Sequence, residues 1–288
     1  LEIAQMYRLG VSQTVSNKVI TGWQDNGTNL KDGSNWSRVI GGDGFESIID
    51  YTDENIMYGA LYYGNIRKST GGGFVSILNS GGTNENSNGA WLTPYILDPT
   101  DHNTIYVGKD RVYKSTDAGG SWTGLGAIAG GNMNGLAVAK SNSNYIYCSK
   151  GSSLFLSTDG NNFNSVSGYP NQYITYIAID PNDEERVWIT LSGFTSNQKV
   201  YFSDDAGATW SNLSTGLPNI PANCITYMEG SNDGLYVGTD AGVYYRDASF
   251  GSWQPYKNGM PNVVVTELQI QYGSNSIIAS TYGRGLWK

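Results

Sequence analysis

The sequence Val-Tyr-Lys-Ser-Thr-Asp-Ala-Gly-Gly-Ser-Trp at residues 112–122 returns as Val-Tyr-Phe-Ser-Asp-Asp-Ala-Gly-Ala-Thr-Trp at residues 200–210. In both copies a β-rich segment ending in Ser leads into Asp and Gly, and a Trp closes the pattern. This order predicts a tight β-hairpin, because Ser and Asp side chains accept hydrogen bonds from N–H groups of the turn and Gly adopts positive φ. Two copies indicate a repeat protein.

Weaker copies extend the series along the chain. Residues 154–160 keep the Ser and Asp but end on Phe163, residues 66–70 lack the Asp and end on Phe74, and residues 243–247 with Trp253 form a stretched member. The number of repeat units follows from short β-rich segments that each precede a turn. These segments lie at 19–23, 56–60, 104–108, 145–149, 186–190, 234–238 and 276–280. These seven units of roughly 40 to 50 residues predict a seven-bladed β-propeller with four-stranded blades.

The first and last units are the least regular. In the first, residues 3–9 and 19–23 are expected to be the inner and second strands, and residues 36–40 the outer strand. The last unit begins near Val264 and has material for three strands only. We therefore expect either a short last blade or a parent chain that continues.

Composition favours an all-β chain with one domain. The 288 residues include 38 Gly, 21 Tyr and 8 Trp, and 39% are hydrophobic, which is sufficient for a core. Aromatic and β-branched residues are interrupted by Gly, Asn, Ser and Asp, and no long stretch has sustained helical spacing. We expect residues 1–288 to be a single propeller domain, and the start at Leu1 suggests a fragment of a longer secreted protein.

The charge and the cysteine content limit the expected binding partners and disulfides. The net charge is −8 with 17 Lys and Arg and no basic run, so nucleic acid is not expected as a partner. No apolar segment approaches the roughly 20 residues that span a bilayer, so no membrane insertion is expected. Cys148 and Cys224 belong to blades separated by another blade, which predicts two buried thiols and no disulfide. The Lys-poor, Asn-, Gly- and Tyr-rich composition is typical of secreted or cell-surface bacterial proteins.

Two aspartates in the first unit are the candidate catalytic residues. In a propeller, the loops between blades and those between second and third strands share one face around the channel, so Asp25 and Asp43 are expected to lie beside Trp23 with Glu46 nearby. Paired carboxylates near an aromatic ring suit glycosidic bond hydrolysis, in which their separation decides the stereochemistry. The alternative interpretation is that both aspartates close turns through their own backbone, since each is near a Gly.

The same face is expected to carry the ligand-binding residues. Aromatic rings mixed with carboxylates and amides suit sugars, whose C–H faces stack on rings while their hydroxyls form hydrogen bonds. The candidate ligand-binding residues are Trp23, Gln24, Glu46, Tyr62, Tyr63, Trp91, Tyr282 and Arg284. With the single histidine His102, a Ser-His-Asp triad or a His-rich metal site has almost no material, and no cofactor or metal is expected.

The hairpins resemble the Asp-box, also called the bacterial neuraminidase (BNR) repeat, which occurs in sialidases, family-74 xyloglucanases and sortilin. The residues that carry this resemblance, and for which it implies a structural role, are Ser115, Asp117, Gly119, Trp122, Ser157, Asp159, Ser203, Asp205, Gly207 and Trp210. Residues 7–13, 22–28, 41–44 and 281–287 further resemble secreted Bacteroidetes proteins of the sortilin/xyloglucanase-like group. In family-74 enzymes the cleft lies between two propellers, so the resemblance implies a second propeller of the same parent chain as a partner.

Two functional hypotheses remain from the sequence. The first is a secreted, non-catalytic recognition module that binds polysaccharide or an extracellular protein through the channel-face loops. The alternative is a glycoside hydrolase of xyloglucanase-like type in which Asp25 and Asp43 act as acid and base. The scarcity of His and Arg favours the first hypothesis.

Overall fold

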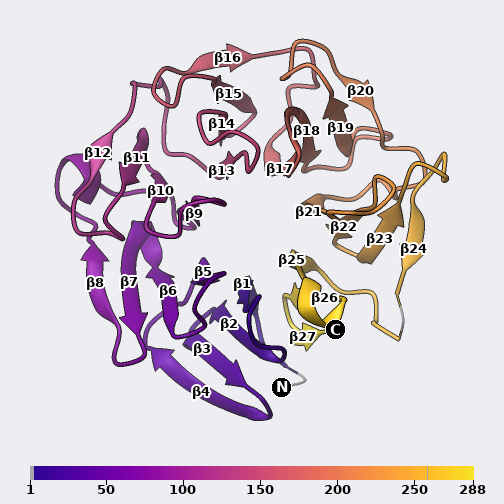
Figure 1. Ribbon diagram of the computed structural model, residues 1–288. Coiled ribbons are helices and arrows are strands. Elements are labelled where there is room, and N and C mark those ends of the chain that lie inside the picture. The colour runs from indigo at the N-terminus through magenta and orange to yellow at the C-terminus, as the bar shows by residue number, and fades with distance from the viewer. Residues whose placement is uncertain (1–2, 258) are drawn as a thin grey trace.

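Seven antiparallel sheets surround a central channel in the computed structural model of the protein, which describes residues 3–257 and 259–288 (Figure 1). Six sheets contain four strands that follow the chain in order, and the seventh contains three. The helical elements of the described residues are three short 3-10 segments, η1 (Tyr62–Gly64), η2 (Asn84–Asn86) and η3 (Tyr272–Ser274). The predicted all-β, seven-bladed propeller is therefore confirmed.

Each blade begins at the channel and runs outward (Figure 1). Blade one contains β1 (Met6–Val11), β2 (Lys18–Trp23), β3 (Gly27–Asp32) and β4 (Asn35–Ile40). Blade two contains β5 (Ser47–Ile49), β6 (Ile56–Leu61), β7 (Asn65–Thr70) and β8 (Val75–Leu78). Blade three contains β9 (Tyr95–Leu97), β10 (Ile105–Gly108), β11 (Val112–Ser115) and β12 (Thr123–Gly124).

The remaining blades follow the same order. Blade four contains β13 (Gly135–Val138), β14 (Ile146–Lys150), β15 (Ser153–Ser157) and β16 (Asn164–Val166). Blade five contains β17 (Ile174–Asp180), β18 (Asp183–Leu191), β19 (Val200–Ser203) and β20 (Ser211–Asn212). Blade six contains β21 (Ala222–Tyr227), β22 (Leu235–Thr239), β23 (Gly242–Arg246) and β24 (Gln254–Tyr256), and blade seven contains β25 (Val265–Gln271), β26 (Ser276–Thr281) and β27 (Leu286–Trp287).

The core lies in the wedges between neighbouring blades. Both faces of a blade pack against another blade, so second strands such as β2, β10 and β14 are buried at every residue. In the wedge between blades five and six, Trp188 is 2% exposed and its ring stacks on Phe202 at 5.0 Å and on Tyr227 at 5.2 Å between centroids. This two-sided burial explains why these strands read as apolar runs rather than as alternating patterns.

Close contact between blades one and two requires glycine at position 22. A Cβ atom there would lie 2.1 Å from the carbonyl oxygen of Phe45, which is far inside van der Waals contact. Glycine is therefore needed at the end of β2, because the backbone that leads into the second blade passes very close to it.

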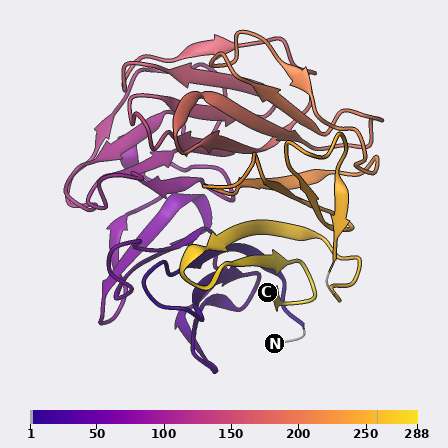
Figure 2. The ribbon, with the colours of Figure 1, turned by 45° about the vertical axis from the view of Figure 1, so that its right-hand side comes forward.

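Blades seven and one lie next to each other where the ring closes (Figure 2), and side-chain hydrogen bonds join them. The backbone N–H of Leu9 donates to Glu267 Oε2 at 2.6 Å, and the N–H of Val11 donates to Gln269 Oε1 at 3.0 Å. Gln269 Nε2 in turn donates to the Leu9 carbonyl at 2.7 Å. Glu267 and Gln269 thus satisfy the backbone groups along the channel edge of β1, as a neighbouring strand would do.

The Ser-x-Asp hairpins lie on the face opposite the channel-face loops. Asp117 accepts hydrogen bonds from the Ser115 hydroxyl and the Ser121 N–H, both at 2.8 Å, and the Gly119 N–H donates to Ser115 Oγ at 2.8 Å. Bonds from the Ser121 hydroxyl and N–H lower the pKa of Asp117 to about 2. Ser203, Asp205 and Gly207 repeat this geometry. The carboxylates are occupied by their own turns, as the sequence predicted.

Several local predictions need correction. Blade one has a third strand, β3, that the sequence analysis did not assign, and β1 begins at Met6 rather than Ile3. Burial also differs among the repeats, because Trp122 and Trp210 are only partly buried, whereas Trp253 of the stretched repeat is 2% exposed. The predicted separation of Cys148 and Cys224 is confirmed, because both are buried, free thiols.

Replacing Trp253 with Ala should destabilise the fold by about 3 to 5 kcal/mol, because the indole fills the wedge between blades five and six. Its Nε1 also donates to the Leu213 carbonyl at 2.6 Å. Urea unfolding followed by tryptophan fluorescence measures the change. Trp210→Ala is the matched control and should lose less, because that ring is half-exposed; equal losses would contradict the assignment.

Candidate functional site

The predicted site residues gather on the channel face, where second strands turn into third strands and one blade passes to the next. The β2–β3 turn carries Trp23, Gln24 and Asp25, and the segment after β6 carries Tyr62 and Tyr63. The connections between blades contain Asp43 and Trp91. The connection between β26 and β27 contains Tyr282 and Arg284. Blades seven, one, two and three therefore contribute one continuous surface.

Six aromatic side chains form a row on this surface, which we call the aromatic ladder: Tyr282, Tyr7, Phe45, Trp91, Tyr62 and Tyr63. Trp91 stacks on Tyr62 with centroids 5.6 Å apart and planes 9° apart, and its edge meets Phe45 at 5.3 Å. Phe45 then stacks on Tyr7 at 4.8 Å. The row joins rings from three blades through direct contacts.

The ladder exposes some rings and buries others. Trp91 is 46% exposed, Tyr62 44% and Tyr282 37%, whereas Phe45 is fully buried beneath them. Trp91 also forms a side-chain hydrogen bond with Tyr7. Buried rings therefore hold exposed rings in fixed positions, which favours binding of a flat apolar surface at low entropic cost.

Trp23 is not part of the ladder. It is 6% exposed and packs against Trp36 at 5.4 Å between ring centroids, in a cluster with Ala4 and Met6. No ring face remains for a sugar. The role predicted for Trp23 as a stacking platform is therefore corrected to a core role, because the tight blade crossing at Gly22 directs the indole inward.

Asp25 and Asp43 are brought together at one end of the ladder. The N–H of Asp25 donates to Asp43 Oδ1 at 2.5 Å, and Asp25 has the left-handed φ of 59°. Asp25 is exposed and Asp43 half-buried. Burial raises the pKa of Tyr7, and the negative charges of Asp43 and Asp25 raise it further. Asp43 thus binds the backbone of the β2–β3 turn at Asp25, and both carboxylates lie close enough to Tyr7 to affect it electrostatically.

The other two predicted residues of this region differ in their contacts. The Tyr282 hydroxyl donates to Gln24 Oε1, which joins blade seven to blade one at the surface. Arg284 is exposed, and its carbonyl accepts a hydrogen bond from Trp287 Nε1 at 2.9 Å. Gln24 and Tyr282 thus support the ladder, while the Arg284 guanidinium projects to solvent.

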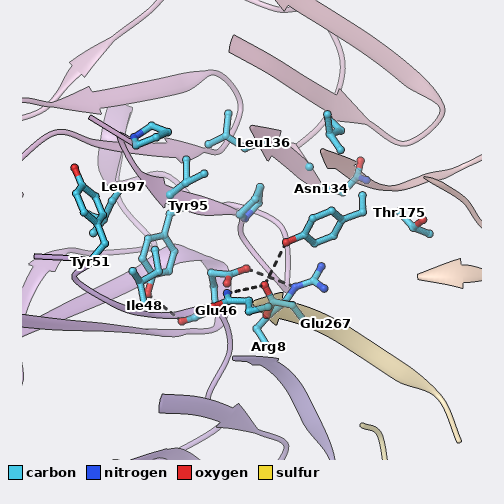
Figure 3. A pocket seen from close by; sticks show the side chains of 17 residues that line it. Arg8, Glu46, Ile48, Tyr51, Tyr95, Leu97, Asn134, Leu136, Thr175 and Glu267 are labelled. Atoms are coloured by element: carbon cyan, nitrogen blue, oxygen red, sulfur yellow. Dashed lines mark hydrogen bonds and ion pairs between the residues drawn. The ribbon is translucent and has the colours of Figure 1, made fainter. Parts of the chain in front are cut away.

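Glu46 lies in the central channel rather than beside Trp23, which corrects the sequence-based placement (Figure 3). Arg8 Nε is 3.5 Å from Glu46 Oε2, and the two side chains are 12% and 14% exposed. Arg8 Nη1 also donates to the Thr266 carbonyl at 2.7 Å. Glu267 joins the group from blade seven, so three charged side chains from three blades share the channel (Figure 3).

The channel contains two carboxyl groups, of Glu46 and Glu267, and one guanidinium group, of Arg8. Burial raises the pKa of Glu46 well above its ordinary value, and the negative charge of Glu267 adds to that increase. Burial also raises the pKa of Glu267, although Arg8 opposes it. The Tyr176 hydroxyl donates to Glu267 Oε1 at 3.2 Å, and the Arg8 guanidinium lies 5.5 Å from the centroid of that ring. The pair of carboxyls, Glu46 and Glu267, therefore favours retaining a proton.

Several cavities line the channel, and two of them contact Arg8. One of about 310 Å³ is lined by Arg8, Glu46, Glu267 and the inner strands of blades two to five (Figure 3). A second, of about 280 Å³, lies at the mouth, where Tyr7 faces Tyr173 of blade five. Tyr173 is 53% exposed, so the mouth has aromatic side chains on both sides.

Sequence reasoning did not assign functions to Tyr7, Arg8, Phe45 and Glu267. Glu267 had a visible signal, since it is a lone carboxylate within the otherwise apolar and amide-bearing strand β25. Tyr7 and Phe45 had none, because aromatic residues are frequent throughout the chain.

Other chemistry has little support in the described residues. They contain no group of three or more His, Cys, Asp or Glu side chains that could hold a metal ion. His102 Nδ1 lies 2.9 Å from Asp50 Oδ2, close to the Ser-x-Asp face. Among residues 3–257 and 259–288, no helix is long and apolar enough to cross a membrane.

Comparison with known proteins identifies similar propellers. No family model matches the sequence. A xyloglucanase of Hypocrea jecorina is 31% identical over an alignment of 162 residues, and the match covers 40% of this chain and 19% of that protein. The GH74 enzyme of Niastella koreensis superposes with a TM-score of 0.69 at 18% identity, over 98% of this chain and 51% of that chain.

Two further structures superpose over nearly the whole chain. An ancestral GH74 enzyme has a TM-score of 0.76 at 16% identity, over 99% of this chain and 45% of that chain. The extracellular domain of a protein described as a hybrid two-component system of B. thetaiotaomicron has a TM-score of 0.76 at 13% identity, over 98% and 39%. This chain resembles the propellers of GH74 xyloglucanase-like enzymes. It spans about half, or less, of the length of each of these four proteins.

The channel carboxyls should make stability depend on pH. The folded state of Glu46 and Glu267 binds protons more tightly than the unfolded state, whose carboxyls have the ordinary value of 4.5. Their contribution is therefore fully present below that value and is lost as pH rises through the raised pKa values. The Tm should fall as the pH rises above the ordinary value of 4.5, and Glu267→Gln should flatten this decline.

Differential scanning fluorimetry across the pH series measures this effect. Glu185→Gln, at an exposed position, should leave the slope unchanged. An unchanged slope in Glu267→Gln, with the fold intact by circular dichroism, would show that the channel pair does not titrate in this range.

Proposed function

We propose that the channel face binds a polysaccharide chain along the aromatic ladder, and that the protein is part of a glycoside hydrolase of xyloglucanase-like type. The observation that carries this proposal is the contiguous row of six fixed rings, four of them exposed, with two carboxylates close to its Tyr7 ring. Sugar rings present C–H faces that pack on aromatic rings, and their hydroxyls suit the amide of Gln24 and the nearby carboxylates. A linear glycan has the repeating flat faces that such a row fits.

The comparisons favour the hydrolase interpretation over the non-catalytic module that the sequence favoured. One similar protein is named a xyloglucanase and two similar structures are GH74 enzymes, whose propellers superpose on this one. Because the chain spans only part of each, we propose that a second propeller supplies the opposite wall of the cleft. We also propose an extracellular location, and we interpret the Ser-x-Asp hairpins as Asp-boxes with a scaffold role.

Binding along the ladder should weaken when its exposed rings are removed. Tyr62→Ala and Trp91→Ala should each reduce affinity for xyloglucan oligosaccharides roughly 2- to 10-fold, since an aromatic contact contributes about 0.5 to 1.5 kcal/mol. Isothermal titration calorimetry measures the affinities. Tyr272→Ala is the matched control, because Tyr272 has the same 46% exposure as Trp91 but lies in η3 on the opposite face.

Wild-type affinity in both ladder variants would exclude the ladder as the binding surface. Loss of affinity in Tyr272→Ala alone would move the site to the other face.

We further propose that Asp25 and Asp43 act as acid and base if the chain is catalytic. Glycoside hydrolysis requires one carboxyl that is protonated and one that is ionised, on opposite sides of the bond. The two aspartates meet at the end of the ladder, where a bound glycan would pass. The bond from the Asp25 N–H to Asp43 also supports the competing turn-closing role.

Asp25→Asn and Asp43→Asn should each lower the rate of β-glucan hydrolysis about 10²- to 10⁴-fold while oligosaccharide binding persists. Reducing-end assays, with calorimetry on the same samples, separate rate from affinity. Asp32→Asn is the control, because that exposed carboxylate ends β3 on the opposite face of the same blade. Equal, background turnover in wild type and variants, with binding retained, would leave a recognition module with turn-closing aspartates.

A further inference from the structure

A fully buried lysine binds the connection that carries Trp91. Lys109 follows β10 and is 0% exposed, although lysine is rarely buried completely unless its charge has partners. Its ammonium donates to the carbonyl oxygens of Asn79 at 2.8 Å, Glu85 at 2.6 Å and Ser87 at 2.9 Å. Because an ammonium has three N–H donors and no acceptor, these bonds use its full capacity.

All three acceptors belong to the connection between blades two and three. We call residues 79–91 of this connection the Trp91 loop; it contains η2 and ends at Trp91. Apart from Ala90 and Trp91, it consists of Asn, Ser, Gly, Thr and Glu, so it has almost no apolar side chains with which to form a core. The Lys109 ammonium binds carbonyls at the start of the loop and near its end, and therefore holds it together from inside.

The stem of Lys109 packs against η1, the segment that carries two ladder rings. A Cβ atom on Gly64 would lie 2.9 Å from Lys109 Cε, so the backbone of η1 and the lysine stem are in direct contact. Tyr63, just before Gly64, has the left-handed φ of 62°, which a tyrosine rarely adopts. Such a backbone conformation persists only where its surroundings fix it, and Lys109 is one of those surroundings.

Backbone hydrogen bonds connect η1 to the end of the Trp91 loop. The Gly89 N–H donates to the Tyr63 carbonyl at 3.0 Å, and the Tyr63 N–H donates to the Trp91 carbonyl at 3.4 Å. The rings of Trp91 and Tyr62, which these two segments carry, are stacked with planes 9° apart. Lys109 thus bonds to one of the two stacked segments and packs against the other.

The proton on Lys109 is held less tightly than that of an ordinary lysine. Burial lowers the pKa of Lys109 from 10.5 to about 8, and the negative charges of Asp110 and Glu85 oppose this change. About nine tenths of the side chain is therefore protonated at pH 7 and about one tenth at pH 9. The titratable side chains on the elements around it are Glu85 of the Trp91 loop, Tyr62 and Tyr63 of η1, Asp110 and Arg111 of the β10–β11 turn, and Tyr113 of β11.

Loss of this proton affects the loop and the whole fold in different ways. A neutral amine has two N–H donors, so one of the three carbonyls loses its partner and the other two bonds lose the help of the charge. The unfolded state, with the ordinary pKa of 10.5, binds the proton more tightly than the folded state. The contribution of Lys109 to the free energy of unfolding therefore rises between about pH 8 and pH 10.5, while the loop loosens.

We propose that Lys109 is a positioning residue for glycan binding, because its protonated ammonium orders the Trp91 loop and thereby holds Trp91 against Tyr62. This inference rests on the proposed function, since it concerns the same aromatic ladder. Lys109 is fully buried and acts through the loop rather than by touching the glycan. Glycan binding should therefore depend on a proton that is lost at mildly alkaline pH.

Hydrogen exchange followed by mass spectrometry tests the ordering role without any glycan. Lys109→Met keeps most of the stem and removes the charge, so amides of residues 79–91 should exchange at least about tenfold faster at pH 7, while the blade strands keep their protection. Lys199→Met is the matched control, because Lys199 is 1% exposed and its ammonium donates to the Gly193 carbonyl at 2.6 Å, in blade five. It should leave the exchange of residues 79–91 unchanged.

Calorimetry with xyloglucan oligosaccharides tests the effect on binding. Lys109→Met should reduce the affinity about 2- to 10-fold at pH 7, as loss of a ladder ring does. The wild-type affinity should fall by a similar factor between pH 7 and pH 9, whereas that of Lys109→Met should be the same at both pH values. A side chain that only filled space would not produce this difference, and Lys199→Met should follow the wild type.

The two measurements separate failure of this inference from failure of the proposed function. Unchanged exchange of residues 79–91 in Lys109→Met, or wild-type affinity in that variant, would overturn the positioning role. Equal affinity of the wild type at pH 7 and pH 9 would overturn the role of the charge, and this comparison needs no variant. If the wild type binds no oligosaccharide at either pH, the proposed function fails, and hydrogen exchange still decides whether Lys109 orders the loop.

Discussion

The bonds from Glu267 and Gln269 to the backbone of Leu9 hold the ring together. The apolar clusters between blades seven and one are small, comprising Leu9, Val11, Val19 and Ile278 in one and Ala4, Met6 and Trp23 in the other. Polar side chains of β25 therefore complete the closure by satisfying the edge of β1. Burying such groups is tolerable only because each finds a partner.

The same closure creates the chemistry of the channel. Glu267 closes the ring with one oxygen and accepts from Tyr176 with the other, and Arg8 lies between it and Glu46. A carboxyl that serves both as a structural acceptor and as part of a buried charged group links ring stability to protonation. Closure and channel electrostatics therefore cannot be varied independently.

The aromatic ladder and the Ser-x-Asp hairpins occupy opposite faces of the propeller. The Ser-x-Asp hairpins consume their carboxylates in local turns, which the lowered pKa of Asp117 reflects. The aromatic ladder instead combines Tyr7, Phe45 and Trp91 from loops and strands of different blades. Blade packing sets the distances between these rings, so the ladder depends on the whole propeller, whereas the hydrogen bonds of Asp117 and Asp205 stay within their own turns.

The sequence alone determined the seven-bladed fold, the Ser-x-Asp hairpins and the separation of the two thiols, because each follows from local turn chemistry or from the spacing of repeats. Only the tertiary structure decided that Trp23 is buried, that Glu46 enters the channel beside Arg8, and that Trp253 fills a wedge more completely than Trp122. The reason is geometric. Which way a residue at a strand end points depends on how one blade crosses the next, as at Gly22 against Phe45, and repeat spacing carries no information about that angle.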